Sequence, residues 1–169
     1  MHLLLSITLI LVCFFRKDWK KIHTYHLTVM YIIICDLLYN LLCHSKPLWR
    51  YTPDIFHHYP ILVDILHSFV NLPALALLYL ANYPFEGNNV IQSKYILKWI
   101  ICSFLVESVF LYFKRIELIN GYEVWMEIPF YSTMYVMLRL HHKRPFLSYF
   151  LSVLIIIFLL FVFKIPLRS

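Results

Sequence analysis

Long apolar runs separated by short polar segments dominate the chain. Six runs stand out, and they are residues 1–15, 24–43, 61–82, 95–113, 124–140 and 146–163. An α-helix needs about 20 residues to cross the hydrocarbon core of a bilayer, with a range of about 17–25. Runs such as LSVLIIIFLLFVF are apolar on every side, as helices in lipid are. The pattern predicts an all-α integral membrane helical bundle of six transmembrane helices, in a single domain over residues 1–169.

Two of the six runs fit the expected span less well. Residues 1–15 are short, but no basic stretch precedes them and no small-residue cleavage site follows, so we expect a retained span. Residues 124–140 contain Glu127 and Pro129. If that segment does not span, the bundle has five transmembrane helices.

Composition favours a membrane protein over a soluble one. Of the residues, 62% are hydrophobic and 14% are charged, and the mean hydropathy is +0.72. Soluble domains are nearer about 45–50% apolar and about 25% charged. The net charge is +6, but Lys and Arg flank the apolar runs, so we expect no nucleic-acid partner. The 4 cysteines form no CxxC pair and predict neither a disulfide framework nor a metal site.

The basic residues indicate an orientation. With six spans, one face of the membrane holds Arg16, Lys17, Lys20, Lys21, Lys94, Lys143 and Arg144. The opposite face holds Lys46, Arg50, Lys114, Arg115, Lys164 and Arg168. Because basic loops favour the cytoplasmic side, we expect both termini outside. The string His141-His142-Lys143-Arg144 is expected to meet anionic lipid headgroups there, so the lipid bilayer is the one partner we assign.

Acidic residues lie inside or at the end of four apolar runs. Asp36 and Asn40 are four residues apart in the second run, so they share a helix face. Asp64 lies in the third run, Glu107 in the fourth, and Glu127 opens the fifth. A carboxylate in a lipid-facing position is costly, so these side chains should point into the bundle. With alternating helix directions, all four acids fall in the outer half.

The third run carries a polar stripe at the i, i+3, i+4, i+7 spacing of one helix face, made of Asp64, His67, Ser68 and Asn71. Spans two to five can therefore converge on one outward-facing polar pocket. Its predicted members are Asp36, Asn40, Asp64, His67, Asn71, Glu107 and Glu127.

Three functions are open for such a pocket. Interhelical hydrogen bonds alone would make it structural, in a non-enzymatic multi-pass membrane protein of unassigned role, which is the interpretation we favour. Four acids and an imidazole also suit a small cation- or proton-coupled transporter or channel. A membrane-embedded metal-dependent hydrolase using Asp64 and His67 is the third alternative.

Sequence motifs give little support to an enzyme. No H-E-x-x-H or G-x-S-x-G string occurs, so we expect no catalytic residue, cofactor or metal. Asp54, His57 and His58 form a D-x-x-H-H string, but it lies in the proline-bounded segment 44–60, and we assign no metal site there.

Several strings together resemble one protein family. They are Arg16 to Lys21 with Trp19, CDLLYNLL at 35–42 followed by Pro47-Leu48-Trp49, Pro73 with LLYL at 77–80, Trp99 with Glu107, Asn120-Gly121-Tyr122, and LRLHHKRP at 138–145. Nearly the whole chain resembles a functionally uncharacterised family of small multi-spanning membrane proteins from spore-forming Bacillota (bacilli and clostridia). The resemblance implies a multi-pass protein of the bacterial cell membrane. It implies as family-like positions Asp36, Asn40, Trp49, Glu107, Asn120, Gly121, Arg139 and His141.

Overall fold

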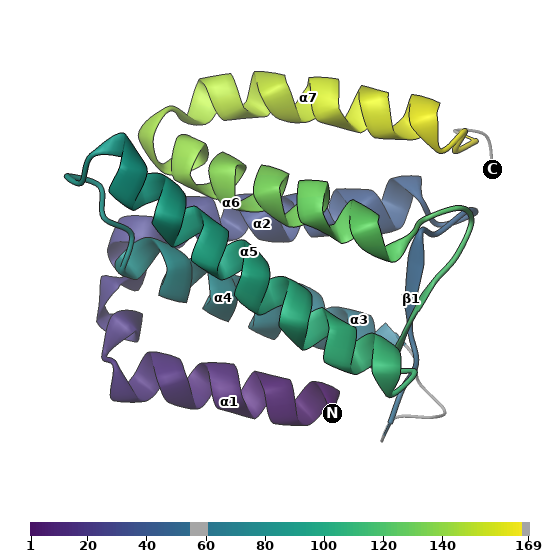
Figure 1. The fold of residues 1–169 in the computed structure, drawn as a ribbon, viewed down its shortest axis with the longest axis horizontal. Helices are drawn as coiled ribbons and strands as arrows, with labels where there is room; N and C mark the ends of the chain where they lie inside the picture. The colour runs from purple at the N-terminus through teal and green to yellow at the C-terminus, as the bar shows by residue number, and fades with distance from the viewer. Residues whose placement is uncertain (55–60, 167–169) are drawn as a thin grey trace.

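Helices that run back and forth along one axis make up most of the molecule (Figure 1). The structure is a computed structural model, which describes residues 1–54 and 61–166. The long helices are α1 (His2–Phe15), α2 (Ile22–Leu42), α5 (Asn89–Tyr112), α6 (Glu127–Lys143) and α7 (Pro145–Val162). A further long segment joins α3 (Ile61–Leu66), η2 (His67–Asn71) and α4 (Leu72–Ala81). Short elements complete the described chain: η1 (Asp18–Lys21), β1 (Trp49–Tyr51), β2 (Ile116–Leu118) and η3 (Val124–Met126).

Four of these helical segments are long and apolar enough to cross a membrane. They are Asp18–Leu42, Ile61–Ala81, Asn89–Tyr112 and Pro145–Val162. The predicted helical architecture is confirmed, and these four segments agree with a membrane protein. The other two predicted spans are α1, a shorter apolar helix of 14 residues, and α6, whose 17 residues end in a basic turn.

The third helical segment departs from the regular α-helix that the sequence predicts. Residues His67–Asn71 form a π-helical turn, in which the Leu72 N–H donates to the His67 carbonyl, five residues earlier. Pro73 follows, and a proline has no N–H and its ring displaces the carbonyl four residues before it. A wider π turn accommodates that ring, as π-bulges do elsewhere in helices. The predicted polar stripe is therefore divided between two neighbouring helices.

A small antiparallel ribbon crosses one end of the bundle, which the all-α prediction did not include (Figure 1). In β1 and β2, Trp49 lies opposite Leu118 and Tyr51 lies opposite Ile116. The turn after β2 contains Gly121, whose φ of 86° is in the left-handed region that favours glycine. Beside it, the Asn120 amide donates to the Pro47 carbonyl at 2.6 Å, which ties this turn to the segment before β1.

Buried tyrosines hold the middle of the bundle. Tyr79 and Tyr135 are fully buried in the main hydrophobic core, and the Tyr79 hydroxyl donates to the Tyr135 carbonyl at 3.0 Å. The Tyr95 hydroxyl donates to the Tyr79 carbonyl at 2.9 Å, and the hydroxyls of Tyr135 and Ser103 lie 2.5 Å apart. Hydrocarbon offers no hydrogen bonds, so these hydroxyls need partners within the protein. They join α4, α5 and α6.

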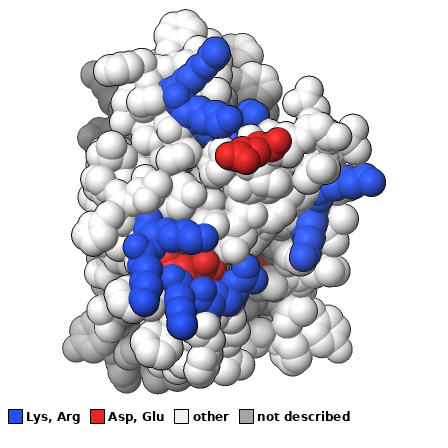
Figure 2. Space-filling view, turned by 90° about the vertical axis from the view of Figure 1, so that its left-hand side faces the viewer, with Lys and Arg blue, Asp and Glu red and all other residues white. Residues whose placement is uncertain are grey.

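The end of the bundle opposite the ribbon is strongly basic (Figure 2). Exposed Lys and Arg side chains gather there from three connecting segments: Arg16, Lys17, Lys20, Lys21, Lys94, Lys143 and Arg144. The Lys143 ammonium lies 5.4 Å from the centre of the Phe85 ring, so the segments before α5 and α7 are adjacent. The structure thus places at one end the segments that the sequence analysis assigned to one face.

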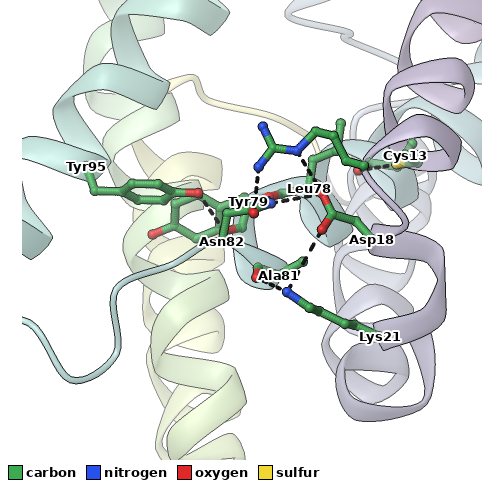
Figure 3. A network of polar contacts seen from close by, with 10 residues as sticks. Cys13, Asp18, Lys21, Leu78, Tyr79, Ala81, Asn82 and Tyr95 are labelled. Carbon is green, nitrogen blue, oxygen red and sulfur yellow. Dashed lines mark hydrogen bonds and ion pairs between the residues drawn. The ribbon is translucent and has the colours of Figure 1, made fainter.

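Asp18 is buried at the centre of this basic end (Figure 3). Its carboxylate accepts from the Asn82 amide at 2.9 Å and from the Arg16 guanidinium at 3.2 Å. The Arg16 guanidinium also donates to the Asn82 side-chain oxygen at 2.6 Å, and the Lys21 ammonium donates to the Ala81 carbonyl at 2.7 Å. These contacts fasten the turn between α1 and α2 to the end of α4.

We expect Asp18→Ala to destabilise the protein by about 1–3 kcal/mol, because the substitution removes the buried acceptor that the Asn82 amide and the Arg16 guanidinium share. Reversible unfolding in detergent micelles measures the change. Glu86→Ala is the matched control, since Glu86 is an exposed acid at the same end. Equal stability of the Asp18 and Glu86 variants would contradict a fastening role for Asp18.

Candidate functional site

A small cavity lies at the ribbon end of the bundle, between α2, β1 and the third helical segment. Its volume is about 20 Å³. A single buried water needs roughly 10–15 Å³ of such space, so the cavity holds about one water-sized particle. The lining residues are Asp36, Asn40, Trp49, Tyr51, Asp64 and His67.

Two carboxylates from different helices face this cavity. Asp36 on α2 accepts from the Ser68 hydroxyl at 2.5 Å and from the Asn40 amide at 3.3 Å. Asp64 is half-buried on α3, and its backbone carbonyl also lies 2.8 Å from the Ser68 hydroxyl. The π turn brings Ser68 against α2, so it positions the Asp36 carboxylate beside Asp64. Two negative groups around so small a space favour a positively charged occupant.

His67 forms the wall of the cavity next to β1. Its ring stacks on Tyr51, with 4.1 Å between ring centres and 7° between ring planes. The strand therefore supplies one side of the stack and the π turn supplies the other. Because Tyr51 also lines the cavity, movement of β1 would change its shape.

A hydrogen-bonded chain fixes the His67 ring from behind. His2 Nε2 lies 3.1 Å from the Thr52 carbonyl, and His2 Nδ1 lies 2.9 Å from His67 Nε2. Asn71 Nδ2 lies 3.3 Å from His67 Nδ1, and the Ser6 hydroxyl donates to Asn71 Oδ1 at 2.7 Å. A carbonyl only accepts, so His2 Nε2 carries hydrogen, His2 Nδ1 accepts and His67 Nε2 donates. The chain is then complete with two neutral imidazoles.

His2 and Ser6 are part of the site, although the sequence analysis did not select them. Their exposed fractions are 1% and 3%, and they are four residues apart on α1. That spacing within an apolar run is the same signal that marked Asp36 with Asn40.

Tyr39 holds the ribbon against α2. Its hydroxyl accepts from the backbone N–H groups of Leu48 at 2.9 Å and Trp49 at 3.4 Å. Its ring stacks on Trp49, with 4.0 Å between ring centres and 5° between planes. Tyr39 comes three residues after Asp36, so one helix face provides both a cavity carboxylate and the support for a cavity wall.

The remaining two predicted acids, here called the acid pair, lie away from the cavity on consecutive helices. Glu107 lies on α5 and Glu127 begins α6. The Tyr131 hydroxyl donates to Glu107 at 2.5 Å, and Glu127 is only 3% exposed. Neither glutamate lines the cavity. The seven residues predicted to share one pocket are thus divided among the cavity, the histidine chain that contains Asn71, and this acid pair.

Tyr51 lines the cavity from the β1 side. Burial raises the pKa of its hydroxyl well above the usual range, and the charges of Asp36, Glu107, Asp64 and Glu127 act in the same direction. Tyr51 was not selected from the sequence, because its position depends on the ribbon.

The family-like positions are spread over both ends of the molecule. Trp49 lines the cavity, while Asn120 and Gly121 form the turn after β2. Arg139 and His141 lie near the basic end. The Arg139 guanidinium is 5.8 Å from the centre of the Tyr83 ring, and His141 stacks on the Tyr31 ring at 4.2 Å. These last two residues bind neighbouring helices together and have no contact with the cavity lining.

The described residues offer no metal centre. Within residues 1–54 and 61–166, no group of three or more His, Cys, Asp or Glu side chains is arranged to hold a metal ion. In the D-x-x-H-H string, His57 and His58 lie outside the described residues, and Asp54 forms an ion pair with the Met1 amino group.

Comparison with known proteins does not identify a relative. No protein-family model, curated protein or solved structure matches this chain. The resemblance to the Bacillota family stays a prediction, and the role of the site rests on its own geometry.

We expect Tyr39→Phe to loosen the ribbon and lower stability by about 1–3 kcal/mol, because the backbone N–H groups of Leu48 and Trp49 lose their acceptor while the ring stack remains. A red shift of Trp49 fluorescence and a lower unfolding midpoint in micelles would report the change. Tyr112→Phe is the control, since Tyr112 is 81% exposed. Unchanged Trp49 emission in Tyr39→Phe would contradict the anchoring role.

Proposed function

We propose that this chain is a non-enzymatic multi-pass protein of a bacterial cell membrane that binds one small monovalent cation at its outer end. The observation that carries the proposal is the cavity between Asp36 and Asp64. Carboxylate and amide oxygens suit hard cations, and Asn40 adds an amide beside the two acids. The cavity has room for about one water-sized particle, which a sodium-sized ion matches.

Contacts of α1 and α6 support a six-span arrangement. α1 starts beside the ribbon, where His2 contacts the Thr52 carbonyl, and ends at the basic end, where Arg16 contacts Asn82. α6 starts at Glu127 in the acid pair and ends at Lys143 over Phe85. Both helices thus extend from one end of the bundle to the other. α1 is about 21 Å long at 1.5 Å per residue, so local thinning of the bilayer accompanies its span.

The distribution of basic residues supports an outward-facing cavity. The basic end carries eight of the 15 Lys and Arg residues, which are Arg16, Lys17, Lys20, Lys21, Lys94, Arg139, Lys143 and Arg144. By the positive-inside rule this end faces the cytoplasm, and the cavity end faces outward. Between the two ends lies the packed core, where Tyr79, Leu80 and Tyr135 have exposed fractions of 0%. That core favours a site reached from one side.

We expect sodium to change the fluorescence of Trp49 saturably in protein reconstituted into nanodiscs, because Trp49 lines the cavity. Asp36→Asn and Asp64→Asn should each weaken sodium binding at least tenfold, about 1.4 kcal/mol. Sodium is titrated against N-methylglucamine at constant ionic strength, and Trp49→Phe identifies the signal. Glu117→Gln, an exposed acid on β2, is the control and should bind like the parent. A folded parent protein without a sodium-dependent signal would refute cation binding.

We expect a cysteine at Glu117 to react with an impermeant maleimide on intact cells, and a cysteine at Glu86 to react only after permeabilisation. Both positions are exposed, and they lie at opposite ends of the bundle. Cys13 and Cys43 are buried, so native labelling at those positions is low. The reverse pattern would place the cavity on the cytoplasmic side.

A further inference from the structure

Two cations on α6 have no acidic partner at the basic end of the bundle. Arg139 and Lys143 are four residues apart, so they lie on the same helix face. Within residues 1–54 and 61–166 neither side chain forms an ion pair, and the buried Nε of Arg139 has no hydrogen-bond partner. A buried N–H of a charged group is costly to leave unpaired, which points to an acceptor from outside the chain.

Two aromatic rings, here called the aromatic wall, face these cations. The Arg139 guanidinium lies 5.8 Å from the centre of the Tyr83 ring. The Lys143 ammonium lies 5.4 Å from the centre of the Phe85 ring. The Tyr83 and Phe85 rings are themselves neighbours, with 4.8 Å between their centres. Contacts with a ring face orient a cation but bring no full negative charge to balance it. The wall therefore holds two positive charges side by side without neutralising them.

The segment that carries the aromatic wall is fixed by one buried side chain of α5. Gln92 is 8% exposed, and its amide donates to the Phe85 carbonyl at 3.3 Å and to the Gly87 carbonyl at 2.7 Å. Its side-chain oxygen accepts from the Tyr83 hydroxyl at 3.0 Å. The wall is thus in place before a ligand arrives. A site that is organised in advance loses less conformational freedom on binding, which favours affinity.

The acids at this end of the bundle do not supply the missing negative charge. Asp18 accepts from Arg16 and Asn82 instead. Glu86 is exposed, and no ion pair joins it to either cation in the part of the chain that the structure describes. A phosphate group fits what remains. The planar guanidinium of an arginine can donate to two phosphate oxygens at once, and a lysine ammonium adds a second charge beside it.

The position along α6 favours the phosphate of a lipid over a free phosphate ion. Lys143 is the last residue of α6, and Arg139 lies about 6 Å before it at 1.5 Å per residue. Lys and Arg near the ends of membrane helices extend toward the headgroups, and basic pockets between helices bind anionic headgroups. Val136, one helical turn before Arg139, is 45% exposed and offers an apolar surface to an acyl chain.

We propose that Arg139 and Lys143 bind the phosphate of one anionic phospholipid against the aromatic wall. The inference goes beyond the proposed function and does not depend on the cation cavity. A basic surface attracts many anionic lipids without selecting a place for any of them, whereas this site holds one. A zwitterionic lipid such as phosphatidylcholine binds less well, because its choline group brings a positive charge close to the two cations.

Native mass spectrometry of the full chain in detergent tests the site, since it counts the lipids that each protein retains. We expect the parent protein to bind one phosphatidylglycerol at least tenfold more tightly than phosphatidylcholine. Arg139→Gln and Lys143→Gln should each weaken phosphatidylglycerol binding about tenfold. Arg139→Lys keeps the charge but loses the planar pair of donors, so it should also weaken binding. Lys94→Gln, at an exposed lysine of the same end, is the control and should bind like the parent.

Two results would overturn the proposal. An equal loss of binding in Lys94→Gln and Lys143→Gln would mean general attraction to a basic surface. Displacement of phosphatidylglycerol by an equal concentration of inorganic phosphate would assign the site to a free anion. Lys143 is exposed, so Lys143→Gln should fold normally and keep the test decisive even where Arg139→Gln fails to accumulate. The unfolding midpoint of each variant in micelles checks its folding.

Discussion

The need to satisfy polar groups without water governs this structure. In a bilayer the hydrocarbon offers no hydrogen-bond partner, so each acidic side chain inside the bundle needs a donor from the protein. Asp36 accepts from Ser68, Glu107 from Tyr131 and Asp18 from Asn82, and in each case the donor belongs to another helix or to the end of one. Each such bond in a membrane bundle contributes only about 0.6 kcal/mol on average. Their value lies in setting which helices meet and at what depth.

Helix positions could be read from the sequence because a span has a required length and a uniform polarity. The run at 61–82 corresponds to Ile61–Ala81, and the run at 146–163 to Pro145–Val162. The π turn could not be predicted from hydrophobic periodicity, since it follows from how Pro73 fits between neighbouring helices. The ribbon was missed for a related reason. Its strands have three residues each, and 64 residues separate Tyr51 from Ile116, which leaves no local pattern.

The sequence indicated which residues belong to the candidate site, but it did not indicate that only some of them line the cavity. Helical spacing correctly brings Asp36 next to Asn40, and the cavity also includes Asp64 and His67. However, the position of a residue along a helix does not tell toward which neighbouring helix its side chain points. Four acids at a similar depth in the membrane therefore suggested one pocket. In the structure neither Glu107 nor Glu127 lines the cavity, and Asn71 turns toward Ser6 on α1.

That division decides what the cavity can hold. Four carboxyl groups around one small space would gather several negative charges, and like charges so close together favour protonation of some of the acids. Two carboxyl groups, with the Asn40 amide and the His67 ring beside them, gather less charge, which suits a single cation. The cavity therefore depends on the acids that the fold keeps away from it as well as on those that line it.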